Sequence, residues 1–362
     1  MEELLMSYYT DKYTGYIEQL EHVSWYENGE VRILDRRIYP IRIEYVSCKR
    51  HEEVAQALTN MVTQGGGPSL TVGMGMCLAA NEARNLPDDE YLSYMEKAGY
   101  TLSHARPTTV FRMVRFVAGL MDCIKQMVAE GRSPDERIEG IKQYSINITK
   151  KGKETALKMG QYVADKIPHN GTIMTQCYAG SMIAGVLLAC RERGNEVKVI
   201  CPETRPYLQG ARLTASVIKE MGFDVTVISD NMPAYVMGEK HVDLFTSAAD
   251  VITMDGHMIN KVGTFQIALA AQYWGIPYVV TGIPVRDRPT LESVVIEERN
   301  EIEVLSHLGT KVTLDGVKAF YPAFDITPPK LCQGVATDKG FYPTYDLWKY
   351  YEDNKDLEGK II

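Results

Sequence analysis

The 362-residue sequence is poor in the residues that build disulfide-rich and metal-binding proteins. It has 7 cysteines, an odd number, and no Cys-x-x-Cys pair, which argues against a disulfide framework and a structural zinc site. It has 7 histidines, and no two of them stand at the spacing of metal ligands on a helix. We therefore expect reduced thiols, a cytoplasmic location, and neither a metal nor a cofactor.

Long apolar runs and an excess of basic residues are also missing. The longest apolar stretches, such as 182–190, are far too short to cross a bilayer. The first residues, Met1-Glu2-Glu3-Leu4, offer neither the basic start nor the apolar core of a signal peptide. Lys and Arg number 39 against 47 Asp and Glu, giving a net charge of −8. We expect no membrane partner and no nucleic-acid partner.

The length and a hydrophobic content of 45% allow a large core that divides in two. We predict an N-terminal domain over residues 1–150, a catalytic domain over 151–345 and a tail over 346–362. In the first domain, partial alternation predicts antiparallel strands at Val31–Leu34 and Ile41–Val46. A 3.6-residue period then predicts a helix ending at Gly65, followed by helices at 69–84, 88–102, 108–130 and 134–165.

The second half alternates short apolar runs with amphipathic segments. The runs lie at 172–175, 197–201, 225–229, 244–246 and 278–281, and the intervening helices include 182–193, 210–221 and 261–274. Such alternation produces right-handed crossovers and a parallel sheet. We predict an α/β protein with a Rossmann-like parallel sheet covered by helices on both faces, plus a smaller N-terminal domain of antiparallel strands and helices.

Polar side chains follow several of these runs, where ligands bind in open α/β sheets. Cys177, Glu203-Thr204-Arg205, Asp230-Asn231 and Asp250 each come after a different run. Each has a structural alternative: Cys177 as a small core residue, Asp230 as a helix cap, Arg205 in a surface ion pair, and Asn260-Lys261 as a mere helix start. Their convergence on one sheet edge favours a site.

The sequence has no Walker motif and no Gly-x-Gly-x-x-Gly between a strand and a helix. It does have the glycine-rich turn Gly65-Gly66-Gly67-Pro68 before a predicted helix. Backbone N–H groups of such a turn can cradle an anion. A tight turn between two helices is the structural alternative.

A series of motifs resembles one enzyme family over roughly residues 30–305. In order they are Gly65–Gly75, Arg106-Pro107-Thr108, Gln176–Gly180, Glu203–Thr214, Ser229–Met232, Ala249-Asp250, Asn260–Thr264 and Ile296–Arg299. This series is similar to the methylthioribose-1-phosphate isomerase family. That family belongs with ribose-1,5-bisphosphate isomerases and with the regulatory α, β and δ subunits of translation initiation factor 2B.

The resemblance implies a homodimeric aldose–ketose isomerase that acts on a sugar 1-phosphate. The family's catalytic cysteine and aspartate correspond to Cys177 and Asp250. Its substrate- and phosphate-binding residues correspond to Gly65, Gly66, Gly67, Arg106, Gln209, Asn260 and Lys261. S-methyl-5-thioribose 1-phosphate, of methionine salvage, is the expected substrate. The alternatives are an isomerase of 5-deoxyribose 1-phosphate or ribose 1,5-bisphosphate, and a non-catalytic regulatory protein.

The chemistry explains these residue types. A sugar phosphorylated at its anomeric oxygen cannot open spontaneously, so ring opening needs a general acid. A thiolate could then remove the C2 proton, or the cysteine could shape the pocket for a hydride shift. Lys261 and Arg106 would hold the phosphate through charge-assisted hydrogen bonds. Neither route is favoured by the sequence.

The sequence departs from the family pattern around these residues. The phosphate turn of the family usually reads Arg-Gly-Ala-Pro, so Gly65 stands where an arginine is usual. Gln176, Tyr178 and Ala179 replace the neighbours usual for the cysteine. With one cation fewer, we expect a singly phosphorylated pentose to be preferred over a bisphosphate.

Overall fold

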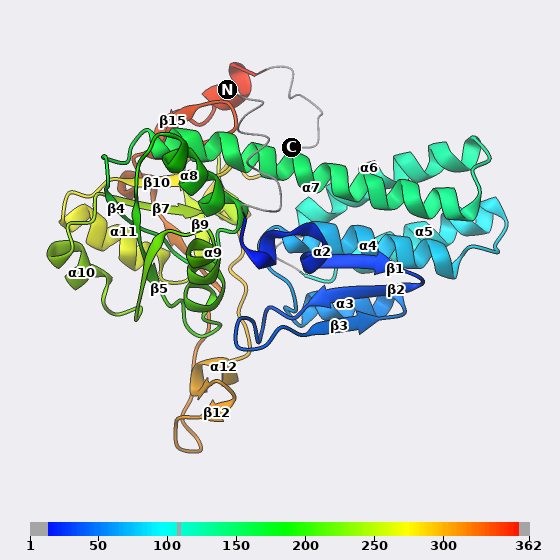
Figure 1. Cartoon of the computed structure of the whole chain (residues 1–362), viewed down its shortest axis with the longest axis horizontal. Helices are drawn as coiled ribbons and strands as arrows, with labels where there is room; N and C mark the ends of the chain where they lie inside the picture. The colour runs from blue at the N-terminus through cyan, green and yellow to red at the C-terminus, as the bar shows by residue number, and fades with distance from the viewer. Residues whose placement is uncertain (1–13, 107–109, 355–362) are drawn as a thin grey trace. The chain divides into compact units, whose positions relative to one another are not determined.

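The computed structural model describes residues 14–106 and 110–354. These form two compact units that divide within helix α7 (Pro134–Ala164), one up to residue 154 and one from residue 155 onward. Figure 1 traces the chain through both units. Residues Pro107 and Thr108 of the arginine motif, the first residues of the chain and the end of the tail lie outside the described residues. The domain limits drawn from the sequence remain a prediction.

The N-terminal unit starts with a 3-10 turn η2 (Tyr16–Glu18) and a short helix α2 (Leu20–Val23). Strands β1 (Ser24–Glu27), β2 (Glu30–Leu34) and β3 (Tyr45–Cys48) then form an antiparallel sheet in that order. The strand expected at 41–46 overlaps β3 only at its end, because β3 begins at Tyr45. Ile41 and Ile43 are 70% and 54% exposed, so their alternation reflects no buried face.

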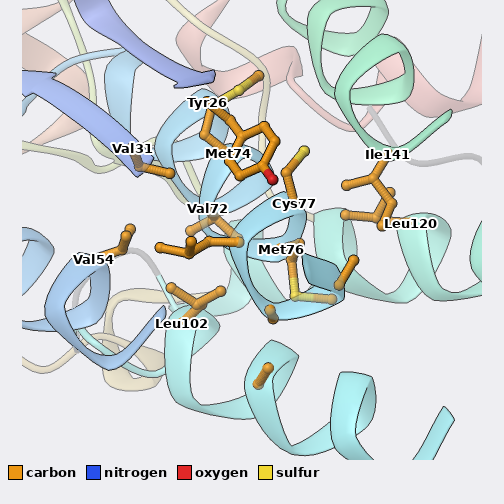
Figure 2. Close-up of a cluster of buried hydrophobic side chains, with 14 of the residues drawn as sticks. Tyr26, Val31, Val54, Val72, Met74, Met76, Cys77, Leu102, Leu120 and Ile141 are labelled. Atoms are coloured by element: carbon orange, nitrogen blue, oxygen red, sulfur yellow. The ribbon is translucent and has the colours of Figure 1, made fainter. Parts of the chain in front are cut away.

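Five helices complete this unit: α3 (His51–Thr59), α4 (Gly67–Glu82), α5 (Asp88–Ser103), α6 (Val110–Ala129) and the first part of α7. Helix α4 is buried at almost every position, and Figure 2 shows its Val72, Met74 and Met76 among apolar side chains of its neighbours. Its glycines allow this close packing. A Cβ on Gly73 would lie 2.1 Å from the Ser145 hydroxyl oxygen of α7.

The C-terminal unit is built on a seven-stranded sheet of order β15-β14-β10-β7-β4-β5-β6. All neighbours from β14 to β6 pair in parallel, and β15 pairs antiparallel at the edge. The strands are β4 (Thr172–Met174), β5 (Lys198–Pro202), β6 (Asp224–Ile228), β7 (Leu244–Ala248), β10 (Tyr278–Thr281), β14 (Gly334–Ala336) and β15 (Phe341–Pro343).

Helices alternate with these strands: α8 (Ser181–Glu192), the π-helical turn η4 (Gly210–Thr214), α9 (Ala215–Glu220), α10 (Pro233–Glu239) and α11 (Thr264–Tyr273). The predicted fold class is confirmed: an α/β sheet, mostly parallel, and a small antiparallel sheet near the N-terminus. Strands β14 and β15 had no counterpart in the sequence prediction. No described helix is long and apolar enough to cross a membrane.

A second small sheet was also missed. It comprises β8 (Val251–Ile252), β9 (Met258–Lys261) and β13 (Phe324–Thr327), all antiparallel in the order β13-β9-β8. The helix expected at 261–274 is present as α11, but its start was misplaced, since Lys261 ends β9 and α11 begins at Thr264. One carboxylate oxygen of Asp325 accepts hydrogen bonds from the N–H groups of Gly263 (2.6 Å) and Phe265 (3.1 Å), which fixes the start of α11.

Between β10 and β13 the chain forms an arm that extends away from the large sheet (Figure 1). It carries α12 (Ile302–Leu305), β11 (Ser306–His307) and β12 (Thr310–Lys311). Leu308 and Leu314 on it are 66% and 83% exposed. The remaining short elements are η5 (Leu291–Ser293), η6 (Pro329–Leu331), η7 (Thr344–Asp346) and α13 (Lys349–Glu352).

Candidate active site

Cys177 lies in the loop that follows β4, at the carboxyl end of the parallel sheet. Its backbone is left-handed (φ 62°), a conformation that costs energy for a residue with a side chain and that recurs at active sites. Two threonines hold it there. The N–H of Cys177 donates to the Thr204 hydroxyl (3.2 Å), and the Thr214 hydroxyl donates to the Cys177 carbonyl. The cysteine is therefore positioned by the loop, whereas a core cysteine would be positioned by its packing.

Asp250 follows the neighbouring strand β7, which pairs with β4 in the sheet. It is half-buried, and its N–H donates to the carbonyl of Ile259 (2.9 Å) in β9. The negative charge of Asp250 contributes to raising the pKa of Cys177, so the two groups interact electrostatically. The structure thus brings both residues to the same edge of the sheet.

Lys261 is 4% exposed, and its charge interacts with both Cys177 and Asp250. Its ammonium nitrogen lies 4.6 Å from the centre of the Phe324 ring, which is its cross-strand neighbour on β13. The pKa of Lys261 is lowered to about 8, chiefly by burial and then by the charge of Arg299, while Cys177 and Asp250 act in the opposite direction. Lys261 is therefore a buried cation that a phosphate would stabilise.

The loop of Cys177 is held against the end of β9 by a close approach. Gly263 has a φ of 103°, and a Cβ on it would lie 2.9 Å from the side-chain nitrogen of Gln176. That nitrogen donates to the carbonyl of Val262 (3.3 Å). Only glycine fits position 263, because any side chain would meet both the backbone strain and Gln176.

Gln209 and Asn260, two predicted binding residues, are both buried. The side-chain nitrogen of Asn260 donates to the Thr264 hydroxyl (3.1 Å). The side-chain oxygen of Gln209 has no hydrogen-bond partner among the described residues. Gln209 precedes the π-helical turn η4, an irregularity that is frequent at functional sites.

The protonation state of the Cys177 thiol bears on one of the two routes that the sequence left open, the removal of the C2 proton by a thiolate. Burial raises the pKa of Cys177 to about 11, and the nearby charges of Lys261 and Arg299 only partly offset it. At neutral pH the thiol of the unliganded protein is therefore protonated.

The four remaining predicted residues belong to the N-terminal unit, so their part in the site stays a prediction. Gly66 is the N-cap of α4, and Gly65 has a φ of 63°, as a tight turn requires. The buried Arg36, which the sequence reasoning did not consider, stands beside this turn and donates to the carbonyl of Gln64. It brings positive charge to the turn that lacks the family's usual arginine.

Two other candidates have structural roles. The carboxylate of Asp230 accepts hydrogen bonds from the backbone N–H groups of Thr204 (2.8 Å) and Arg205 (2.6 Å), so it fixes the turn after β5 and caps no helix. The guanidinium of Arg205 donates to the carbonyls of Glu303 (3.2 Å) and Ser306 (2.8 Å) at the base of the arm. Arg205 is thus committed to backbone carbonyls and forms no ion pair with another described residue.

One group of potential metal ligands occurs among the described residues, in the N-terminal unit: His51, Glu52 and Glu82. Its main contacts are already explained by local structure. Glu82 accepts from the backbone N–H of His51 (2.9 Å) and from the Tyr94 hydroxyl (2.7 Å), and it lies 2.6 Å from Nδ1 of His51. These bonds fix the start of α3 and do not point to a cation.

The family model for the initiation factor 2 subunit family matches residues 69–344. The chain belongs to this family. A family relative named methylthioribose-1-phosphate isomerase, from Thermosipho africanus, is 35% identical over 343 residues, covering 90% of this chain and 96% of the relative. The resemblance stated from the sequence motifs is thereby confirmed.

Solved structures of the family agree. The crystal structure of 5-methylthioribose 1-phosphate isomerase from Pyrococcus horikoshii matches with a TM-score of 0.78 and 32% identity, covering 92% of this chain and 96% of that one. The structure of the translation initiation factor eIF-2B, subunit delta, from A. fulgidus matches with a TM-score of 0.74 and 30% identity, covering 93% and 99%.

Arg299 was not among the predicted site residues, although it ends the motif Ile296–Arg299. Its guanidinium pairs with Glu297 (2.9 Å) and lies 5.6 Å from the Phe324 ring, so Arg299 and Lys261 approach the same aromatic ring. The charge of Arg299 acts on both Cys177 and Lys261. The only signal in the sequence was the family resemblance of Ile296–Arg299, since residues 294–324 carry no clear periodicity.

Proposed function

We propose that this protein is an aldose–ketose isomerase that converts S-methyl-5-thioribose 1-phosphate to S-methyl-5-thioribulose 1-phosphate in methionine salvage. One observation carries the proposal. Relatives named methylthioribose-1-phosphate isomerase align over nearly the whole chain, and Cys177 and Asp250 follow adjacent strands at the edge where α/β sheets bind ligands.

In this proposal Cys177 and Asp250 share the proton transfers. One group protonates the ring oxygen as the ring opens, and the other handles the hydrogen that leaves C2. The raised pKa of Cys177 argues against a thiolate that is present before substrate binds. Lys261 holds the phosphate, while Gln209 and Asn260 bind sugar hydroxyls through buried amide groups.

The committed guanidinium of Arg205 supports a substrate with one phosphate. A second phosphate bound by Arg205 would have to replace its hydrogen bonds to the arm carbonyls. Desolvating a phosphate without such partners is unfavourable. We therefore expect methylthioribose 1-phosphate to react faster than ribose 1,5-bisphosphate, measured as kcat/KM under identical conditions.

The proposal includes a metal-independent homodimer in the cytoplasm. An apolar stripe on α11 supports self-association, because Phe265, Leu269 and Tyr273 recur every four residues and are 36%, 48% and 81% exposed. Seven free cysteines suit a reducing compartment. Light scattering tests the dimer, and activity that vanishes in EDTA and returns with added metal would contradict metal independence.

The deciding experiment is a panel of sugar 1-phosphates with ketose formation followed by NMR. We expect turnover of methylthioribose 1-phosphate, with weaker turnover of 5-deoxyribose 1-phosphate and ribose 1,5-bisphosphate. Running the reaction in D₂O tests the mechanism, since deuterium at C1 of the ketose requires proton transfer through a base that exchanges with solvent and would exclude a direct hydride shift.

A second candidate is a non-catalytic regulatory protein. The match to the eIF-2B delta subunit, at 30% identity and over 93% of this chain, favours it. A purified protein that turns over no member of the panel, yet binds a nucleotide or sugar phosphate in calorimetry, would replace the isomerase with this alternative.

A further inference from the structure

Tyr321 is a buried polar residue next to the site that has no role in the mechanism so far. It lies three residues before the first residue of β13 and is 3% exposed. Its carbonyl accepts from the backbone N–H of Arg299 (2.9 Å), which ties it to the Glu297–Arg299 stretch. The guanidinium of Arg299 reaches the phenolic oxygen as a donor, and no described residue offers an acceptor to the phenolic proton.

The surroundings of the Tyr321 hydroxyl are those of the site. Burial raises the pKa of Tyr321 to about 12, the neighbouring Arg299 lowers it, and the charges of Glu303 and Cys177 raise it. Arg299 cannot take the phenolic proton, because a guanidinium has donors but no acceptor. The hydroxyl is therefore a neutral donor near Cys177 at any pH at which the protein works.

A buried hydroxyl whose proton has no acceptor is unusual. Roughly nine in ten buried polar groups are hydrogen-bonded, and leaving a donor without an acceptor destabilises the folded protein. Tyr278 of the same unit shows the ordinary arrangement, because its buried hydroxyl lies 2.7 Å from the Ser247 hydroxyl. A ligand in the site would supply the acceptor that the described part of the chain does not offer to Tyr321.

We propose that the Tyr321 hydroxyl donates a hydrogen bond to a sugar oxygen of the bound sugar phosphate, beside Cys177. The inference rests on the proposed isomerase function and adds a residue of substrate recognition to it. As hydrogen leaves C2, the C2 hydroxyl loses its proton and becomes the ketose carbonyl, and a preorganised donor stabilises the negative charge that this oxygen gains. The proton stays on Tyr321 throughout, so the step needs no further proton acceptor.

The test is Tyr321→Phe, which removes the hydroxyl and keeps the ring. We expect kcat/KM to fall about 10- to 100-fold, the size of a hydrogen bond to a charged group. The Tm should change little, because the phenolic proton has no acceptor among the described residues to lose. Separating kcat from KM shows whether the bond strengthens in the transition state, and either a lower kcat or a higher KM supports the contact.

Tyr278→Phe is the matched control. It removes a buried hydroxyl with a protein partner, so its Tm should fall while kcat/KM stays within about twofold of the wild type. An unchanged kcat/KM in Tyr321→Phe, with or without a lower Tm, overturns the inference and leaves the isomerase intact. A wild type that turns over no sugar 1-phosphate removes the proposed function itself, which is a different and separately visible outcome.

Discussion

The two units of this chain bury different kinds of side chains, apolar ones around α4 and ionisable ones at the edge of the large sheet. The core around α4 of the N-terminal unit is apolar: methionine, valine, leucine and small residues fill it (Figure 2). Its glycines let neighbouring helices pack closely. At the sheet edge of the C-terminal unit, burial encloses Lys261, Arg299, Tyr321 and the Cys177 thiol. The same loss of water gives stability in the first region and shifted pKa values in the second.

This contrast predicts that substitutions in the two regions separate stability from activity. Variants at the sheet edge should lose turnover and keep the fold, and variants around α4 should do the reverse.

Cys177→Ser and Asp250→Asn should each lower kcat by about a thousandfold or more, because each removes a group placed in proton transfer. Thermal unfolding should change little, since both residues are incompletely buried and sit in loops after strands. Ketose formation by NMR and a thermal melt measure the two effects. Near-normal turnover in either variant would take that residue out of the mechanism.

Leu120→Ala should do the opposite. Leu120 is fully buried in the cluster around α4, and truncation of such a leucine costs about 2–5 kcal/mol of unfolding free energy. Urea unfolding measures the loss, and kcat per folded molecule should be unchanged. Val114→Ala is the control, because Val114 lies on α6 like Leu120 but is 40% exposed. This truncation should cost about 0.5 kcal/mol of unfolding free energy or less.

Lys261 links charge to substrate affinity. Because its pKa is lowered to about 8, its ammonium is charged below that pH and lost above it, so kcat/KM should fall as pH rises through about 8. Lys261→Ala should raise KM about 10- to 100-fold, the loss of a charge-assisted contact. Lys166→Ala, which removes a cation over the ring of Phe341, should leave KM unaltered.

Lys261→Arg sharpens this prediction. Arginine stays protonated in proteins, so the fall of kcat/KM near pH 8 should disappear in this variant even if its rate is lower. Persistence of the same pH profile would assign the titration to another group.

The smallest expected effect concerns Asp325. Burial raises its pKa to about 6, so the folded state binds a proton that the unfolded chain, near its ordinary value of 3.8, does not. Relative to Asp325→Asn, the wild type should therefore gain about 1 kcal/mol of stability when the pH falls from 7 to 5. Urea unfolding at the two pH values measures this difference. If the wild type instead lost stability relative to Asp325→Asn at pH 5, the N–H groups of Gly263 and Phe265 would stabilise the carboxylate more than burial destabilises it.

Local patterns predicted the parts of the fold that local patterns build. Strands β4, β5, β6, β7 and β10 came from short apolar runs, and α4 to α8 came from the 3.6-residue period. The small sheet did not, because β8 has two residues and β9 and β13 pair across a separation that no local period records. For the same reason Lys261 was read as a helix start, although it ends a strand.

The candidate site divides in the same way. Cys177 and Asp250 could be found because each follows a predicted strand, and parallel strands end at one edge. Arg299 and Tyr321 lie in a stretch without periodicity and reach the site only through the pairing of residues 297–299 with 321–323. The assignment of Arg106 to phosphate binding rests on the family resemblance alone, and that of Gly65–Gly67 rests on the resemblance and on the glycine-rich turn.

The sequence by itself determined the α/β class, the family and the chemical types at the sheet edge, because apolar periodicity and short motifs are properties of neighbouring residues. Only the tertiary structure decided the state of those groups. The side chains that exclude water around these groups raise the pKa of the Cys177 thiol and lower the pKa of Lys261. They also leave the proton of the Tyr321 hydroxyl without an acceptor among the described residues. Those neighbours come from segments far apart in the chain, and burial acts through distance in space.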